Sequence, residues 1–207
     1  RKCFLCVKNL PAEQKGILYD DNYIILCNPF PIFPTHFTLT HKEHTPQRII
    51  DTFSDMLDLS KDLSKHYSVI YNGPRCGASA PDHLHFQAGN KFFMTIDDES
   101  HQVKNEYGKV IYENDDLSFY AIDDGVRKFV SIESLDKELV TNTFNKFYKT
   151  YSELMNEEQE PMINLVSFYE EEYGWRVITF LRAKHRPAVF FAEDESKMLV
   201  SPAAIDL

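Results

Sequence analysis

The pattern with the most chemical potential is His83-Leu84-His85-Phe86-Gln87, in which three polar side chains occupy alternate positions. Alternate side chains of an extended strand point to the same face, so two imidazoles and an amide would share one face. Leu84 and Phe86 would take the other. Neighbours on one face lie about 6.5–7 Å apart along a strand, so one imidazole can bind a metal while the next meets a substrate.

A loop of small residues, Asn72-Gly73-Pro74-Arg75-Cys76-Gly77-Ala78-Ser79-Ala80-Pro81, precedes this strand. Glycines let backbone N–H groups approach phosphate oxygens closely. The loop and the strand together therefore favour chemistry at a phosphate group. By itself, a His-x-His pair is more often structural than catalytic.

Cys3 and Cys6 form a Cys-x-x-Cys pair near the start of the sequence. The four cysteines are too few and too unevenly placed for a disulfide framework. The pair by itself is compatible with metal binding, redox chemistry or simple core packing. Cys27 and Cys76 are expected to be small apolar fillers.

Hydrophobic periodicity predicts the elements that position these residues. In the first part of the chain, it predicts two short strands within 16–26, a helix over about 47–67, and strands at 68–72 and 83–88. In the second part, it predicts strands at 108–115 and 117–122, a helix over about 135–154, and strands near 162–168 and 175–181. The same order of elements therefore occurs twice.

This repeat indicates a duplication with an offset of 93 residues, from Tyr112 minus Tyr19. We predict an α+β fold in which two related halves, 1–100 and 101–207, each supply an antiparallel sheet and one long helix and pack as an intramolecular pseudo-dimer. The junction is expected in the polar stretch 97–106. Adding the offset to His83 and His85 gives Arg176 and Ile178, so the second half is not expected to hold a second active site of this kind.

Composition limits the classes of partner. With 43% hydrophobic and 14% aromatic residues, the 207-residue chain can bury a substantial core. No apolar run approaches the roughly 18 residues needed to span a bilayer, and the net charge of −10 argues against nucleic-acid or anionic-membrane binding. A cytoplasmic protein that binds neither nucleic acid nor membranes is expected. The aromatic residues Tyr23, Phe30, Phe33 and Phe37 are expected to build the core.

With these motifs, the chain resembles the histidine triad superfamily, in the branch that holds galactose-1-phosphate uridylyltransferase, diadenosine tetraphosphate phosphorylase and the GDP-hexose phosphorylases. The motif His-Leu-His-Phe-Gln is nearest to that of the last group. The segments 17–28 and 34–39, followed by His44, match the order of the family's first hairpin and second strand. The resemblance covers about the first 90 residues, and the remainder agrees in layout.

The resemblance implies that His85 is a nucleophile that attacks the α-phosphorus of a nucleotide and becomes covalently nucleotidylated. A neutral imidazole is available near pH 7 and forms a phosphoramidate that can transfer its group again. Histidine triad hydrolases carry a third histidine where this chain has Gln87. An amide can hydrogen-bond to a phosphoryl oxygen but supplies no proton to a leaving group, so Gln87 favours transfer or phosphorolysis over hydrolysis.

The resemblance also implies a structural zinc ion bound by Cys3, Cys6, His44 and His83. Two thiolates and two imidazoles make a closed tetrahedral set, which anchors the chain and leaves no open position for catalysis. His41 is the main rival ligand.

Several further residues are candidates for holding a nucleotide and its phosphates. The resemblance places Asn28 at the ribose hydroxyls. Asn72, Arg75, Ser79 and the Gly77 backbone are candidate phosphate contacts. The segment 182–187 is the densest basic cluster of the acidic chain and a candidate clamp for the second phosphate. Its candidate ligands are Arg182, Lys184, His185 and Arg186.

The leading expectation is phosphorolysis of a nucleoside diphosphate hexose, with inorganic phosphate or a sugar phosphate as the second substrate. Two alternatives within the same class are nucleotidyl transfer between sugar phosphates and phosphorolysis of a dinucleoside polyphosphate. A zinc-stabilised nucleotide-binding module without turnover is the alternative from a different class.

Overall fold

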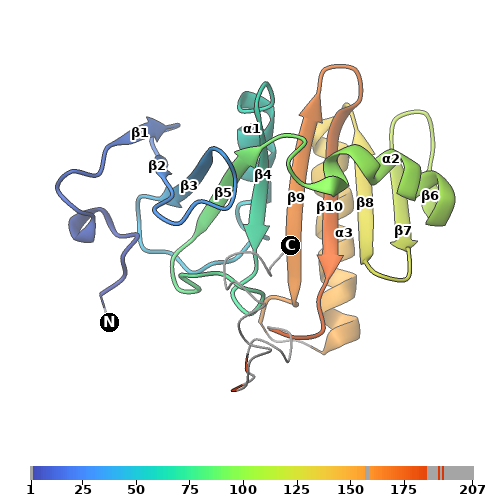
Figure 1. Ribbon diagram of the computed structural model, residues 1–207. Coiled ribbons are helices and arrows are strands. Elements are labelled where there is room, and N and C mark those ends of the chain that lie inside the picture. Colours follow the sequence, from blue (N-terminus) through green and yellow to red (C-terminus); the bar gives the residue numbers. More distant parts are fainter. Residues whose placement is uncertain (1, 157–158, 186–190, 192, 194–207) are drawn as a thin grey trace.

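A computed structural model describes residues 2–156, 159–185, 191 and 193, and its strands form one antiparallel sheet (Figure 1). The first five strands are β1 (Gly16–Tyr19), β2 (Tyr23–Cys27), β3 (His36–His41), β4 (Tyr67–Asn72) and β5 (His85–Asn90). The next five are β6 (Gly108–Glu113), β7 (Ser118–Asp123), β8 (Lys128–Ser134), β9 (Ile163–Glu170) and β10 (Gly174–Leu181). Their order across the sheet is β1-β2-β3-β5-β4-β9-β10-β8-β7-β6.

This strand order reads alike from either edge of the sheet. From one edge it runs β1-β2-β3-β5-β4, and from the other it runs β6-β7-β8-β10-β9. Strands β4 and β9 pair in the middle, from Val69 opposite Ser167 to Asn72 opposite Asn164. A mixed fold with a large antiparallel sheet is therefore confirmed.

Helix α3 (Lys137–Met155) covers one face of the sheet (Figure 1). It begins where the carboxylate of Asp136 accepts hydrogen bonds from the backbone N–H groups of Glu138 and Leu139, as a helix N-cap does. Its buried side chains recur every four residues, so they form one stripe against the sheet. They are Val140, Phe144 and Tyr148.

Helix α1 (Phe53–Asp62) lies on the same face, and the ring of Phe53 stacks on that of Phe144 with 3.8 Å between centroids. The predicted helix over 47–67 was too long at both ends. Before α1, the backbone N–H of Ile49 donates to a Glu160 carboxylate oxygen at 2.6 Å and so takes no part in a helix. Beyond α1, the chain enters β4 at Tyr67.

The stretch 97–106, predicted as a polar junction, is instead part of helix α2 (Thr95–Tyr107). Helix α2 lies on the opposite face of the sheet from α1 and α3 (Figure 1), and its Ile96 and Val103 are buried against that face. The sequence pattern missed this helix because only a few of its residues are apolar. The chain therefore has three α-helices in its described part, where two were expected.

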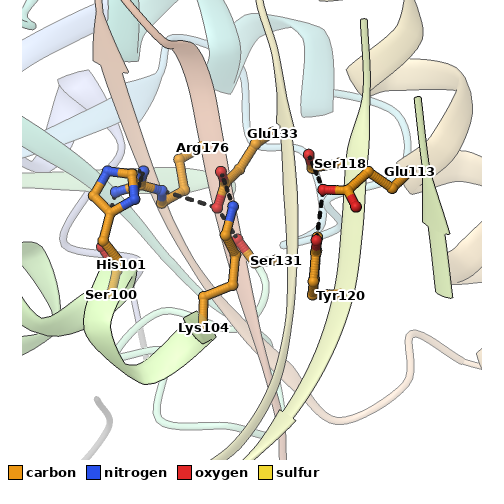
Figure 2. A network of polar contacts seen from close by, with 9 residues as sticks. All are labelled: Ser100, His101, Lys104, Glu113, Ser118, Tyr120, Ser131, Glu133 and Arg176. Carbon is orange, nitrogen blue, oxygen red and sulfur yellow. Dashed lines mark hydrogen bonds and ion pairs between the residues drawn. The ribbon is translucent and has the colours of Figure 1, made fainter. Parts of the chain in front are cut away.

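A partly buried polar network holds α2 against the sheet (Figure 2). Lys104 of α2 donates to the Glu133 carboxylate at 2.8 Å, and Arg176 of β10 donates to the same carboxylate at 3.1 Å. Arg176 also donates to the Ser100 hydroxyl of α2 at 2.8 Å. Although burial acts to raise it, Arg176 and Lys104 hold the pKa of Glu133 below its usual value, so the carboxylate remains charged between two cations.

Several smaller expectations are corrected by the fold. Phe30 is 78% exposed and Cys27 is exposed, so neither belongs to the core, whereas Tyr23, Phe33 and Cys76 are buried as expected. Strand β8 was missed. Within the described residues, no helix has the length and apolarity to cross a membrane.

Glu160 is a buried carboxyl group that ties three segments together. It accepts hydrogen bonds from the Tyr71 hydroxyl of β4 and the Ile49 backbone N–H, both at 2.6 Å. Although these two donors act to lower the pKa of Glu160, burial outweighs them and raises it to about 7. The carboxyl group therefore holds a proton in the folded protein at pH values where it has lost it in the unfolded chain.

We predict that Glu160→Gln stabilises the protein relative to wild type as the pH rises from about 4.5 to about 7. In this range the unfolded wild-type chain loses the Glu160 proton first, which favours unfolding by up to about 3 kcal/mol at the upper end. Urea unfolding of both proteins at several pH values measures the difference in unfolding free energy. A difference that does not change with pH would contradict the prediction.

Candidate functional site

Strand β5 carries two of the predicted catalytic side chains between β3 and β4. His85 pairs with Thr40 of β3, and Gln87 pairs with Thr38 of β3 and Ile70 of β4. Because Phe86 packs in the core beneath α1 and α3, the side chains on either side of it point to the opposite face. His85 and Gln87 therefore share one face, as the alternation predicted.

His85 has an imidazole with one nitrogen engaged. Its Nδ1 lies 2.8 Å from the carbonyl oxygen of His83, which can only accept, so Nδ1 carries the proton. Burial lowers the pKa of His85 to about 4, which keeps the ring neutral at pH 7. The lone pair is then on Nε2, which makes no hydrogen bond with the described residues. Such a ring has the electronic state that a nucleophile toward phosphorus needs.

The side chain of His85 is only 2% exposed. One cavity of about 740 Å³ lies beside α3, and another of about 370 Å³ lies between α2 and β10. Neither is lined by His85.

Gln87 is held by a neighbour that the sequence analysis did not single out. The Oε1 atom of Gln87 lies 2.8 Å from Nε2 of His36, and Nδ1 of His36 lies 3.3 Å from the backbone N–H of Ile32. Since Nδ1 accepts from that N–H, Nε2 carries the proton and donates to Oε1. This leaves the NH₂ group of Gln87 as the end of the amide that is free to donate to a substrate.

Asn28 lies at the end of β2, close to the same group of side chains. Its Nδ2 donates to the Thr38 hydroxyl at 3.1 Å and its Oδ1 accepts from the Phe30 N–H at 2.9 Å. The structure therefore brings the predicted ribose-binding residue to the strand that pairs with β5.

Asn72 ends β4, two residues beyond the position opposite Gln87, and so lies on the same face as His85. Its side chain is 8% exposed and its Oδ1 is buried without a hydrogen-bond partner among the described residues. A buried amide oxygen without a partner is costly and is tolerated where a ligand or water completes the site. The predicted phosphate-binding role of Asn72 agrees with this position.

The loop that follows Asn72 turns tightly. The N–H groups of Cys76 and Ala78 both donate to the Gly73 carbonyl, at 2.8 and 3.4 Å, and Gly77 has a positive φ of 100°. Ser79 is exposed. A side chain at position 77 would be strained in this conformation, which accounts for a glycine there.

The predicted basic cluster reaches this loop at one described residue. Nδ1 of His185 lies 2.8 Å from the Arg75 carbonyl oxygen, while the Arg75 guanidinium donates to the Glu160 carbonyl at 3.0 Å. Lys184 is exposed and Arg182 is half-buried just after β10. Arg186 lies outside the described residues.

The four predicted zinc ligands gather at one point. The ligand atoms of Cys3, Cys6, His44 and His83 all lie within 4.8 Å of one another. The Cys3 sulfur is 3.3 Å from Nδ1 of His83, and the Cys6 sulfur is 3.2 Å from Nδ1 of His44. Tetrahedral zinc with these ligands would place sulfur and nitrogen about 3.5 Å apart, so the donor set fits a zinc ion.

The outer nitrogens of both imidazoles also have acceptors, as is usual for metal-binding histidines. Nε2 of His83 donates to the His41 carbonyl at 2.7 Å, and Nε2 of His44 lies 3.4 Å from the Asp82 carboxylate. The rival ligand His41 does not join the cluster through its ring, whose Nδ1 contacts Glu43.

Two residues near His85 were missed by the sequence analysis. The sequence could have indicated His36, because His36, Thr38 and Thr40 alternate along β3 and face the same side as His85 and Gln87. No such pattern indicated Gln47. It lies in an irregular segment before α1, and only the fold shows that its amide contacts the His85 main chain.

The comparisons with known proteins agree with this geometry at the level of fold. A family model described as "Domain of unknown function (DUF4922)" matches residues 1–90. No curated protein matches the chain.

Solved structures are similar over most of the chain. A DUF4931 family protein from Bacillus cereus is 15% identical with a TM-score of 0.56, over 89% of this chain and 94% of that one. Yeast Ap4A phosphorylase Apa2 in complex with AMP is 19% identical with a TM-score of 0.58, over 82% of this chain and 60% of Apa2. Apa2 in complex with Ap4A is 18% identical with a TM-score of 0.53, over 86% of this chain and 63% of Apa2.

These likenesses show that the chain shares its fold with the DUF4931 family protein and with Apa2. The chain spans less than two thirds of the length of Apa2.

We predict that the purified protein contains about one zinc ion per chain, because two thiolates and two imidazoles make a closed zinc site. Replacing both Cys3 and Cys6 by serine should remove the metal and lower the melting temperature. Cys27→Ser is the matched control, since Cys27 is exposed and lies outside the cluster. Metal content is measured by atomic emission on the same preparations, and zinc retained by the double variant would contradict the site.

Proposed function

We propose that this chain is a nucleotidyl-transferring enzyme, a phosphorylase or transferase, that acts on a nucleotide substrate through a covalent intermediate on His85. One observation carries the proposal. A neutral imidazole, with its Nδ1 proton donated to the His83 carbonyl, shares a face with the Gln87 amide and the unpartnered Asn72 oxygen. This combination offers a nucleophile together with polar groups for a phosphoryl group.

In the first step of the proposed reaction, Nε2 of His85 attacks the α-phosphorus of the nucleotide. A bond forms between nitrogen and phosphorus while the bond from phosphorus to the bridging oxygen breaks. The leaving group is a sugar phosphate, or a nucleoside polyphosphate when the substrate is a dinucleoside polyphosphate. It departs with the electron pair as a stabilised anion, so it needs no proton. The ring gains positive charge, which the His83 carbonyl stabilises through the Nδ1 proton.

In the second step, an oxygen of inorganic phosphate or of a sugar phosphate attacks the same phosphorus. The bond from phosphorus to Nε2 breaks and the ring recovers its lone pair, so the enzyme is regenerated. Gln87 donates its NH₂ group to a phosphoryl oxygen in both steps and supplies no proton. This favours transfer to a phosphate over hydrolysis, and it predicts ping-pong kinetics.

The four-residue cluster of Cys3, Cys6, His44 and His83 would hold a zinc ion in this proposal. A closed tetrahedral site supplies no catalytic chemistry and acts by anchoring the chain. His83 contributes its ring to this cluster and its carbonyl oxygen to His85. The cluster would therefore orient the nucleophile through one shared residue.

For the substrate, we propose a nucleoside diphosphate hexose as the first candidate, because the motif from His83 to Gln87 is nearest to that of the GDP-hexose phosphorylases. The second candidate is a dinucleoside polyphosphate. It is favoured by the likeness to Apa2, which binds AMP and Ap4A in its solved structures. Both candidates share the nucleotide α-phosphate and differ in the leaving group.

We further propose that residues 1–100 and 101–207 are duplicated halves with a single active site. The proposal rests on the strand order, which is alike from either edge. At the positions that the repeat assigns to His83 and His85, strand β10 carries Arg176, which holds α2, and Ile178, which is buried. The second half would thus have exchanged catalytic groups for contacts with α2.

The proposal predicts that wild type forms a labelled adduct and that His85→Ala forms none, because Nε2 of His85 is the attacking atom. The protein is incubated with GDP-glucose or Ap4A labelled at the α-phosphate and quenched in detergent at alkaline pH, where phosphoramidates persist. Gel autoradiography measures the adduct, and its loss on adding inorganic phosphate measures the second step.

His66→Ala is the matched control, since His66 is exposed and lies beside the end of β5 that is remote from His85. The control should retain the adduct. Tight binding of either nucleotide without an adduct in wild type would refute the enzyme and favour a nucleotide-binding module.

A further inference from the structure

The buried side chain of Gln47 is bound to the main chain of the proposed nucleophile. Its Oε1 accepts from the His85 N–H at 2.8 Å, and its Nε2 donates to the His85 carbonyl and to the Asn72 carbonyl, both at 2.9 Å. Gln47 is 2% exposed and does not belong to a strand. All the hydrogen-bonding groups of its amide are thus directed at the two strands that flank the candidate phosphate site.

The amide takes the place of a strand residue. In an antiparallel pair, every second residue directs both its N–H and its C=O toward the same neighbouring strand. Gln87 is opposite Ile70, so the next such position on β5 is His85, and its partner in register would be Asn72. The pairing of β4 with β5 ends at Ile70 and Gln87, and His85 exchanges both bonds with Gln47 instead.

This substitution has a geometric consequence. A direct pair would bring the main chains of His85 and Asn72 within hydrogen-bonding distance, whereas here one amide stands between their carbonyl groups. The strands therefore diverge at this point. Their side chains lie on the same face of the sheet, so the divergence separates the His85 ring from the unpartnered Asn72 oxygen.

We infer that Gln47 is a positioning residue that fixes the main chain of His85 and sets the width of the slot between His85 and Asn72. The inference rests on the proposed function, in which this slot receives the α-phosphate. Gln47 meets no substrate. It acts through His85, whose ring is held from the other side by the His83 carbonyl.

The first test is Gln47→Met, which keeps the length of the side chain and removes all three hydrogen bonds. Because the reacting nitrogen is displaced, the rate of adduct formation in a single turnover with labelled Ap4A should fall about 10²-fold. The dissociation constant for AMP, measured by calorimetry, should change less than about threefold, since binding groups such as Asn28 stay in place.

Two further variants separate positioning from folding. Gln47→Glu retains the acceptor for the His85 N–H and should give an adduct rate between those of wild type and Gln47→Met. Gln102→Met, on the exposed side of α2, is the matched control and should leave the rate unchanged. An adduct rate in Gln47→Met equal to wild type, or a loss of rate fully explained by a fraction of unfolded protein in thermal melts, would overturn the inference.

A measurement without substrate keeps this inference distinct from the proposed function. Nitrogen-15 NMR reports the chemical shifts of the His85 ring nitrogens, and hydrogen exchange reports the protection of the His85 N–H. Both should change in Gln47→Met and remain as in wild type in Gln102→Met. If wild type forms no adduct, the proposed function fails, and unchanged NMR signals in Gln47→Met would separately overturn the positioning role.

Discussion

The main chain from His83 to His85 is held from several sides, and the rest of the candidate site depends on this restraint. The His83 ring belongs to the sulfur and imidazole cluster, and its carbonyl oxygen accepts the Nδ1 proton of His85. The amide of Gln47 takes up the N–H and the carbonyl of His85. A reacting nitrogen must be placed to within a fraction of an ångström. A strand that is restrained in this way can hold a side chain more precisely than a loop can.

The polar side chains of the candidate site lie on the part of the sheet that the described helices do not cover. Helices α1 and α3 cover one face along both parts of the sheet, while α2 covers the other face over the later strands. Arg176 and Lys104 meet Glu133 there and secure α2 through charge-assisted hydrogen bonds. At the corresponding place beside β5, the face presents polar side chains instead. The same sheet thus carries packing contacts with α2 on one side of the β4–β9 pair and polar side chains beside β5 on the other.

Burial shifts the pKa of the imidazoles and of the buried carboxyl group in this region in opposite directions. It lowers the pKa of His85 and His36, which keeps both rings neutral and able to accept at one nitrogen. It raises the pKa of Glu160, which ties the chain before β9 to β4. Neutral imidazoles suit attack on phosphorus and the orientation of an amide, whereas a protonated carboxyl group can join buried segments without an unpaired charge.

The four possible metal ligands, which lie far apart in the sequence, followed from the family resemblance. Alternation and spacing in the sequence by themselves determined most of the antiparallel strands and the shared face of His85 and Gln87, because such patterns depend on neighbours along the chain. They also indicated α3, whose apolar stripe is regular. Helix α2 was missed because it has too few apolar residues to form a clear helical pattern, and their packing against the sheet is visible only in the fold. Only the tertiary structure decided the burial of His85, the His36 contact with Gln87 and the place of Gln47 between β4 and β5. Each of these depends on residues that lie far apart in the sequence, and no local pattern encodes which of them meet.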